Sequence, residues 1–172
     1  LLSAEINLSP QGPALATVYV GGGTPSLLRP DQIAALLQQL RGRFGFQDGA
    51  EITLEMDPAT FGRSDLRALI EAGVTRVSLG GQSFDDLRLA ALGRRHRRQD
   101  LLEACYWLQE FLQIGGLQSW SLDLIRNLPD QGGEEWAAQL EQAVAVRAPH
   151  VSIYDLSVDT GTVFAWRAKR GE

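Results

Sequence analysis

The chain has 172 residues, of which 44% are hydrophobic and 22% are charged, a composition typical of one globular domain and not of a disordered segment. Its net charge of −5 argues against a nucleic-acid-binding surface, which needs an excess of lysine and arginine. We find no apolar run of the roughly 20 residues that span a bilayer, and no signal peptide. The single cysteine, Cys105, leaves no disulfide framework and favours a cytoplasmic protein.

Strands and helices are predicted to alternate along the chain. An apolar, β-rich run at 16–20 ends on three glycines, and residues 31–43 have apolar side chains at helical spacing. Alternation of this kind predicts parallel strands joined by helical crossovers. Either an open doubly wound sheet or part of a β/α barrel fits, because a complete eight-fold barrel typically needs about 250 residues. Further strands are predicted at 51–56, 74–79, 118–125 and 150–156, and further helices at 1–8, 63–72, 85–92, 100–113 and 134–146.

Each predicted strand after the first has one apolar and one polar face, because side chains alternate across a strand. Parallel strands are usually apolar on both faces, and buried carboxylates are costly unless they are paired. Solvation of an edge strand would explain one such pattern, but four together favour a polar ligand held inside or across the top of a barrel. The polar positions are Thr53 and Glu55, then Ser78, Gly80 and Gln82, then Ser119, Ser121 and Asp123, and finally Ser152 and Tyr154.

Two loops carry less specific signals. The Gly-Gly-Gly-Thr-Pro-Ser segment at 21–26 is neither a dinucleotide fingerprint nor a phosphate loop, so a tight turn and a ligand-binding loop are equally compatible with it. The basic run at 94–98 is either a solvated loop or a local anion site. His96 and His150 are isolated; a role as a metal or heme ligand stays open for each, and we predict surface or capping roles for both. No spacing suggests the Ser-His-Asp arrangement of a hydrolase.

Five short motifs lie along the chain, four of them in or directly after predicted strands and one at the end of the predicted helix 85–92. They are Gly21-Gly22-Gly23-Thr24-Pro25-Ser26, Glu55-Met56-Asp57-Pro58, Ser78-Leu79-Gly80-Gly81-Gln82-Ser83-Phe84-Asp85, Leu92-Gly93-Arg94-Arg95-His96, and Ser121-Leu122-Asp123-Leu124-Ile125 with Leu128-Pro129. In this order and spacing they resemble the oxygen-independent coproporphyrinogen oxidase and heme chaperone family of radical S-adenosylmethionine (SAM) proteins. The resemblance covers nearly the whole chain. It implies an α/β fold, a partial parallel TIM-like barrel of the radical SAM type with about five βα units.

The resemblance also implies a SAM site. In the family, SAM is bound against a [4Fe–4S] cluster and cleaved reductively to a 5′-deoxyadenosyl radical. The polar strand faces independently point to three of these implied contacts, Glu55, Gln82 and Asp123. The positions that match SAM contacts of the family are Gly22, Gly23, Thr24, Glu55, Gln82, Arg94 and Asp123.

The cluster ligands of the family are not found in this chain. Its Cys-x3-Cys-x2-Cys motif lies upstream of the glycine loop, whereas no cysteine precedes Gly21 here and Cys105 falls within a predicted helix. The chain also begins with Leu1 and not with methionine. We therefore expect residues 1–172 to be an internal fragment of a radical SAM core domain, without the first barrel strand and the C-terminal domain. Such a fragment is predicted to be inactive by itself, with no catalytic or metal-binding residue.

Within the family, the chain resembles the heme chaperone branch. Gln82-Ser83-Phe84 and the ending at 159–164 are similar to that branch, whereas coproporphyrinogen dehydrogenases usually have Gln-Asp-Phe. The full-length parent is then expected to bind SAM, a [4Fe–4S] cluster, and heme or a porphyrin, and to deliver heme to a respiratory acceptor protein. Two alternatives stay open: an oxygen-independent coproporphyrinogen III oxidase of heme biosynthesis, and a truncated or degenerate product without activity. Gly81 departs from the family pattern, which has valine there.

Overall fold

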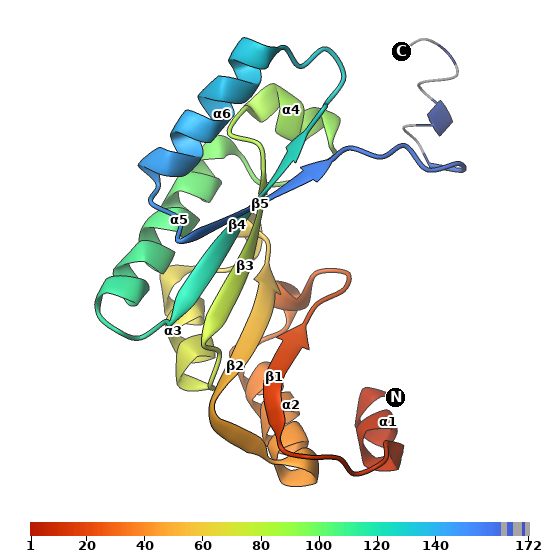
Figure 1. The fold of residues 1–172 in the computed structure, drawn as a ribbon, viewed down its shortest axis with the longest axis vertical. Coiled ribbons are helices and arrows are strands. Elements are labelled where there is room, and N and C mark those ends of the chain that lie inside the picture. The colour runs from red at the N-terminus through yellow and green to blue at the C-terminus, as the bar shows by residue number, and fades with distance from the viewer. Residues whose placement is uncertain (163–164, 167–169, 171–172) are drawn as a thin grey trace.

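The computed structural model describes residues 1–162, 165–166 and 170 (Figure 1). The chaperone-like motif at 159–164 therefore extends outside the described residues. Five strands form one parallel sheet in which the spatial order equals the chain order. These strands are β1 (Leu15–Val20), β2 (Phe46–Met56), β3 (Arg76–Gln82), β4 (Ser119–Arg126) and β5 (His150–Asp155).

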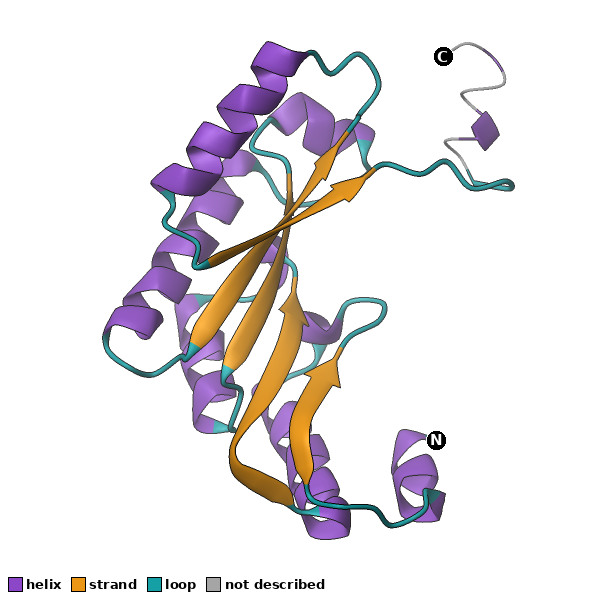
Figure 2. Ribbon diagram, viewed as in Figure 1, coloured by secondary structure: helices purple, strands orange, loops and turns teal. Residues whose placement is uncertain are grey.

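Helices follow the strands and cover one face of the sheet. In Figure 2 the strands curl away from these helices, which leaves the opposite face concave and without a covering layer of helices. The unchanged strand order and the one-sided cover confirm the partial β/α barrel and exclude the doubly wound sheet, which has helices on both faces. The helices are α1 (Leu2–Leu8), α2 (Pro30–Phe44), α3 (Arg63–Glu71), α4 (Asp86–Ala91), α5 (Arg98–Gln113) and α6 (Gly133–Ala145), with short 3₁₀ turns η1 (Pro25–Leu27) and η2 (Pro58–Thr60).

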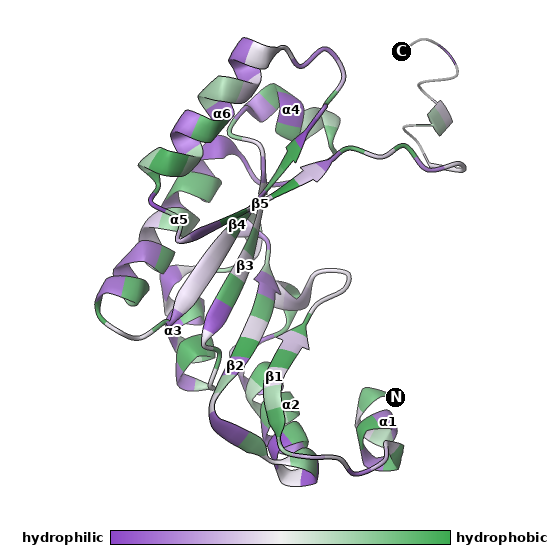
Figure 3. Cartoon of the chain, viewed as in Figure 1, coloured by the Kyte–Doolittle hydropathy of each residue, from purple (hydrophilic) through white to green (hydrophobic). Residues whose placement is uncertain are grey.

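The core lies between the sheet and these helices. On β2, β3 and β4 the apolar strand face is buried there, as the alternation predicts, and each large side chain contributes roughly 1.5–3 kcal/mol. On β5 the prediction fails, because Ile153 is exposed. On α5 the buried residues recur every three or four positions, which makes one stripe of the helix apolar. Figure 3 shows such hydrophobic and hydrophilic stripes on the covering helices. The fully buried strand residues are Leu54, Val77, Leu79, Trp120, Leu122 and Leu124.

Side chains fix where several helices begin. Asp85 precedes α4, and its Oδ1 accepts hydrogen bonds from the amides of Leu87 and Arg88 at 2.8 and 2.9 Å. Asp100, in the first turn of α5, accepts from the Arg97 amide at 2.7 Å. Among the described residues, no helix is both long and apolar enough to cross a membrane.

Two strands differ from the sequence prediction by more than one residue. β2 begins at Phe46, five residues before the predicted start, because a register irregularity against β1 lets the less apolar segment 46–50 extend the strand. β3 begins at Arg76 and continues to Gln82, whereas we predicted 74–79. Its extension crosses an irregularity between Gly80 and Gln82 in the pairing with β4. Polar spacing along a strand cannot reveal such an insertion.

Gly81 is the residue that this irregularity inserts. A Cβ atom at Gly81 would lie 2.6 Å from Cδ1 of Leu122 and 3.1 Å from Cδ1 of Leu101. Both leucines are fully buried, so they occupy the space that a side chain at position 81 would need. Packing on the helix side of the sheet therefore leaves no room for a side chain at position 81.

We expect Gly81→Val to lower the free energy of unfolding by about 1–3 kcal/mol, because it overpacks this part of the core. Leu122→Ala alone should cost about 2–5 kcal/mol. In the double variant the valine fills part of the space left by the leucine, so the two costs should not add, and a coupling of about 0.5–3 kcal/mol is expected. Urea unfolding of the four proteins measures this. Additive costs would show that position 81 and Leu122 do not compete for space.

Candidate functional site

A cavity of about 320 Å³ opens at the carboxyl ends of the strands. β1 to β5 run in the same direction, so the residues at their ends converge at one end of the half-barrel. All seven residues that the sequence analysis matched to SAM contacts line this cavity. They are Gly22, Gly23, Thr24, Glu55, Gln82, Arg94 and Asp123.

Glu55 joins the end of β2 to the glycine loop. Its Oε2 accepts a hydrogen bond from the Gly22 amide at 3.1 Å, and its Oε1 accepts from the Tyr19 hydroxyl at 2.8 Å. Gly22 has φ +120°, and a Cβ on Gly21 would lie 2.9 Å from Oε1 of Glu55, so both positions require glycine. Burial, followed by the hydrogen bond and the charge of Glu55, raises the pKa of Tyr19. Tyr19 thus stays a neutral donor that holds the Glu55 carboxylate.

Asp123 lies at the end of a short chain of hydrogen bonds across the sheet. Ser121 donates to the Ser78 hydroxyl at 3.2 Å, and Ser78 donates to Oδ2 of Asp123 at 2.8 Å. The other oxygen, Oδ1, is buried and has no hydrogen-bond partner among the described residues. A buried acceptor without a donor is costly. Asp123 also lines the cavity, so its carboxylate retains an acceptor site that no described residue fills.

Gln82 lies at the cavity because its backbone has an unusual conformation. Strand pairing places it beside Leu124, whose side chain faces the helices, yet Gln82 lines the cavity. Its φ of +63° lies in the left-handed region, so its side-chain direction does not follow strand alternation. The amide Nε2 lies where a side chain on Gly80 would be, 3.0 Å from the position of a Cβ there. The sequence analysis placed Gln82 on the correct face of the sheet. It assumed, however, that regular strand alternation continues to this residue, and that assumption is wrong.

Asp57 connects Arg94 to the strand ends. Its Oδ2 lies 3.8 Å from an Arg94 guanidinium nitrogen, and its Oδ1 lies 3.6 Å from Nδ1 of His96. Burial raises the pKa of the Asp57 carboxyl, but the neighbouring His96, the Ala59 amide and the charge of Arg94 outweigh it, so the pKa is lowered overall. The carboxylate is therefore ionised at neutral pH and holds Arg94 at the cavity.

The predicted surface or capping role of His96 is wrong. Its side chain is fully buried, and Nε2 lies 3.1 Å from the Gly81 carbonyl oxygen. Because a carbonyl oxygen only accepts, Nε2 carries the hydrogen of this bond. His150, in contrast, is exposed. Two residues of the basic run thus belong to the site: Arg94 lines the cavity, and His96 is buried behind it.

Sequence reasoning also missed Tyr19, Asp57 and Ser78 as site residues. All three line the cavity or hold a residue that does. Ser78 was assigned to the polar strand face, and Asp57 was part of a quoted motif, so position within the pattern could have identified both. Tyr19 lies in an apolar run, and only the geometry shows its hydroxyl at Glu55.

The cavity is acidic overall. Its lining contains the carboxyl groups of Glu55, Asp57 and Asp123 and one arginine, Arg94. Such a lining favours a ligand that carries positive charge and hydrogen-bond donors and has one anionic group for the arginine.

The described residues do not fit an iron–sulfur cluster. No group of three or more histidine, cysteine or acidic side chains among them is arranged to hold a metal ion. Cys105 is buried in α5, and burial raises its pKa to about 12, so it is a neutral thiol, whereas cluster iron requires thiolates.

Known proteins share the sequence pattern and the fold of this chain. The Radical SAM superfamily model matches residues 7–117. The chain belongs to the radical SAM superfamily. It is 39% identical to the heme chaperone HemW of Haemophilus influenzae, covering 89% of this chain and 39% of that protein. Identity to the heme chaperone HemW of Escherichia coli is also 39%, over 91% of this chain and 40% of that protein.

The fold is also found in solved structures. Coproporphyrinogen III oxidase (HemN) from Escherichia coli matches 90% of this chain and 34% of its own, with a TM-score of 0.77 and 29% identity. The archaeal Methanocaldococcus infernus Elp3 matches with a TM-score of 0.72, 91% of this chain, 40% of its own and 22% identity, which shows the fold alone. The radical SAM chain described here spans about two fifths of the length of the curated relatives it matches.

The lowered pKa of Asp57 predicts a loss of stability in acid. Its ordinary pKa is 3.8 and the folded value is lower, so the stabilisation is fully present above about pH 4 and is lost as the pH falls through the folded value. Asp57→Asn removes this ionisation. Its free energy of unfolding should therefore change less between about pH 5 and about pH 3 than that of the wild type.

Urea titrations across this pH range measure the effect, with Asp48→Asn, the same change at an exposed position of β2, as the control. Equal pH dependence of the wild type and Asp57→Asn would contradict the assignment.

Proposed function

We propose that the cavity binds SAM through the seven lining residues matched from the sequence. The observation that carries this proposal is the buried, unpartnered Oδ1 of Asp123 at an acidic cavity. SAM carries a sulfonium and an ammonium group, one carboxylate and ribose hydroxyls. The carboxylates of the lining complement the two positive groups and accept hydrogen bonds from the hydroxyls, and Arg94 complements the carboxylate.

Each lining group has capacity left for such a ligand. Glu55 uses one acceptor site on each oxygen for Gly22 and Tyr19, and a carboxylate offers about four such sites. Asp57 orients Arg94 without neutralising its guanidinium fully, since their closest atoms are 3.8 Å apart. SAM in this superfamily serves reductive cleavage at a [4Fe–4S] cluster. Since the described residues do not fit a cluster, we assign to them the binding and orientation of SAM, and place cluster and heme in the full-length parent.

We infer that the parent protein is a heme chaperone, which binds heme and delivers it to an acceptor protein of respiration. Support comes from the relatives named heme chaperone HemW, which cover about nine tenths of this chain, and from the Gln82-Ser83-Phe84 motif. The second candidate is an oxygen-independent coproporphyrinogen III oxidase, favoured by the structural match to the HemN enzyme. We place this function second because the sequence identity to the HemN enzyme is lower than that to the HemW proteins. We further propose a cytoplasmic location, where a free thiol such as Cys105 stays reduced.

Asp123→Asn should weaken SAM binding by about tenfold or more, because the change removes a charged acceptor and hydrogen bonds to charged groups contribute about 1.5–3 kcal/mol. Equilibrium dialysis of the 172-residue chain with labelled SAM measures the dissociation constant. Glu134→Gln, which removes the same charge from an exposed position of α6 outside the cavity, is the matched control. Equal SAM affinity in the wild type and Asp123→Asn would count against the site.

The full-length protein distinguishes the two candidate functions. A heme chaperone should shift the visible absorbance of added hemin at stoichiometric concentration, and should leave coproporphyrinogen III intact when SAM and a reductant are supplied without oxygen. Spectrophotometric titration and chromatography of the porphyrin products measure both. Decarboxylation of coproporphyrinogen III would show that the protein acts as the oxidase and not as the chaperone.

A further inference from the structure

The backbone of Gln82 is held in a conformation that costs free energy. Its φ of +63° is one of few positive values among the described residues other than glycine, and a glutamine gains nothing there from its own side chain. Such a conformation persists only where the surroundings enforce it. Because Gln82 lines the cavity, the groups that enforce its backbone also set where its amide lies.

Two of these groups act on Gly81, immediately before Gln82. The Gly81 carbonyl oxygen accepts hydrogen bonds from the Ser83 amide at 2.7 Å and from Nε2 of His96 at 3.1 Å. The first closes a tight turn around Gln82, and the second ties this turn to the loop that carries Arg94. Together they fix the residue before the turn.

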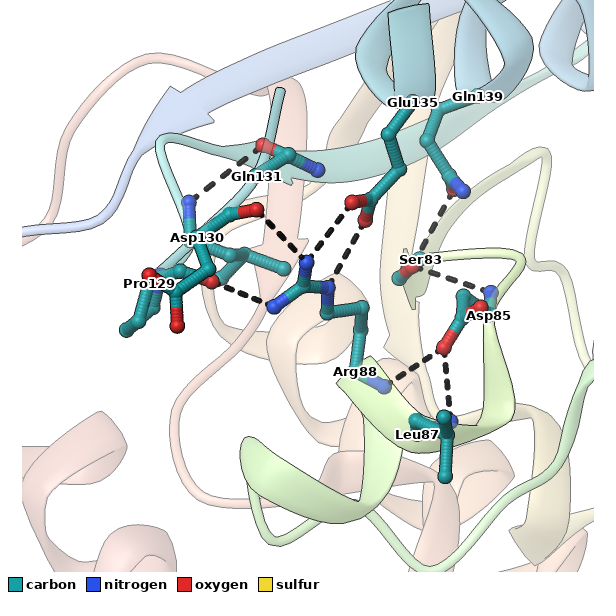
Figure 4. Close-up of polar contacts among 10 residues, drawn as sticks. Ser83, Asp85, Leu87, Arg88, Pro129, Asp130, Gln131, Glu135 and Gln139 are labelled. Atoms are coloured by element: carbon teal, nitrogen blue, oxygen red, sulfur yellow. Dashed lines mark hydrogen bonds and ion pairs between the residues drawn. The ribbon is translucent and has the colours of Figure 1, made fainter. Parts of the chain in front are cut away.

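Gln139 of α6 fixes the residues after the turn. Its Oε1 accepts hydrogen bonds from the Phe84 amide at 2.6 Å and from the Ser83 hydroxyl at 3.2 Å. The Ser83 hydroxyl in turn accepts from the Asp85 amide at 3.1 Å, as Figure 4 shows. Gln139 is only 6% exposed. For helix packing alone, an apolar side chain would serve as well as this buried amide. The amide differs in that its oxygen accepts hydrogen bonds from two donors of the turn.

An ion pair keeps α6 in place against this turn. Arg88 of α4 donates two hydrogen bonds to Glu135 of α6, each 2.8 Å long, and also bonds the backbone carbonyls of Pro129 and Asp130 (Figure 4). Glu135 and Gln139 are one helical turn apart and lie on the same side of α6. The ion pair therefore holds Gln139 at the distance that its hydrogen bonds to the turn require.

We propose that Gln139 is a positioning residue of the cavity: it acts through the backbone of Ser83 and Phe84 to hold Gln82 in its left-handed conformation, with the amide at the ligand. The consequence for SAM affinity rests on the proposed function, whereas the effect on the Gln82 backbone does not. Gln139 itself does not line the cavity, so a change there alters ligand binding only through this turn.

The test compares two substitutions of similar size. Gln139→Met removes the acceptor, whereas Gln139→Glu keeps two acceptor oxygens at the same place. Gln139→Met should weaken SAM binding on the order of tenfold and speed hydrogen exchange of the Phe84 amide, and Gln139→Glu should restore both toward the wild type. Gln142→Met is the control: Gln142 lies three residues further along α6 and bonds Arg98 instead of the turn. It should change neither quantity.

Equilibrium dialysis and amide exchange are measured on the same 172-residue preparations, with far-UV circular dichroism as the check of folding. Ser83→Ala, which removes one of the two donors, is the milder variant and should shift both quantities in the same direction if Gln139→Met does not fold. Unchanged exchange at Phe84 in a folded Gln139→Met or Ser83→Ala protein overturns the proposal. Faster exchange with unchanged SAM affinity overturns the positioning of the ligand.

A wild-type chain that binds no SAM overturns the proposed function instead. In that case faster exchange of the Ser83 amide, whose hydrogen bond to Gly81 closes the turn around Gln82, in Gln139→Met but not in Gln142→Met still supports the hold of Gln139 on the Gln82 backbone.

Discussion

Side-chain alternation in parallel strands is the constraint on which this molecule depends. One face of each strand must be apolar to pack beneath the helices, as Leu54 and Leu122 do with no exposed surface. The other face is then free to be polar, and since all five strands run in one direction its last residues meet at one end of the sheet. Glu55 and Asp123 are neighbours in space for this reason. The site is a consequence of the way the core is built.

That constraint explains how much the sequence could predict. The alternation of strands and helices, the apolar strand face and the places of Glu55 and Asp123 on the polar face follow from local periodicity. The strand order does not, because periodicity fits a doubly wound sheet equally well and only the resemblance to the family implied a partial barrel. His96 does not, because its burial depends on a carbonyl at Gly81 that a bulge turns toward it. The length of β2 and the space taken by Leu122 beside Gly81 likewise depend on partners distant in the sequence. Gln139 lies in no motif, and only the folded chain brings it to Phe84.

The polar groups of the cavity are held in two ways. Glu55 is anchored on both oxygens, by Gly22 and by Tyr19, so the glycine loop is fixed before any ligand arrives. Asp123 is anchored on one oxygen only. The first arrangement sets the shape of the site, and the second leaves a defined acceptor within it. Binding to groups that are already ordered avoids part of the entropy loss that accompanies ligand capture.

The left-handed backbone of Gln82 also limits how this position can evolve. Glycine would relieve the conformational cost but remove the amide from the cavity, and a β-branched residue would raise that cost while offering no amide. Asparagine tolerates the backbone better but is one methylene too short to lie over Gly80 as Gln82 does. Each of these replacements therefore loses either the amide or its reach over Gly80. The neighbouring Gly81 is limited by packing instead of by conformation: a larger residue fits there only if Leu122 or Leu101 becomes smaller.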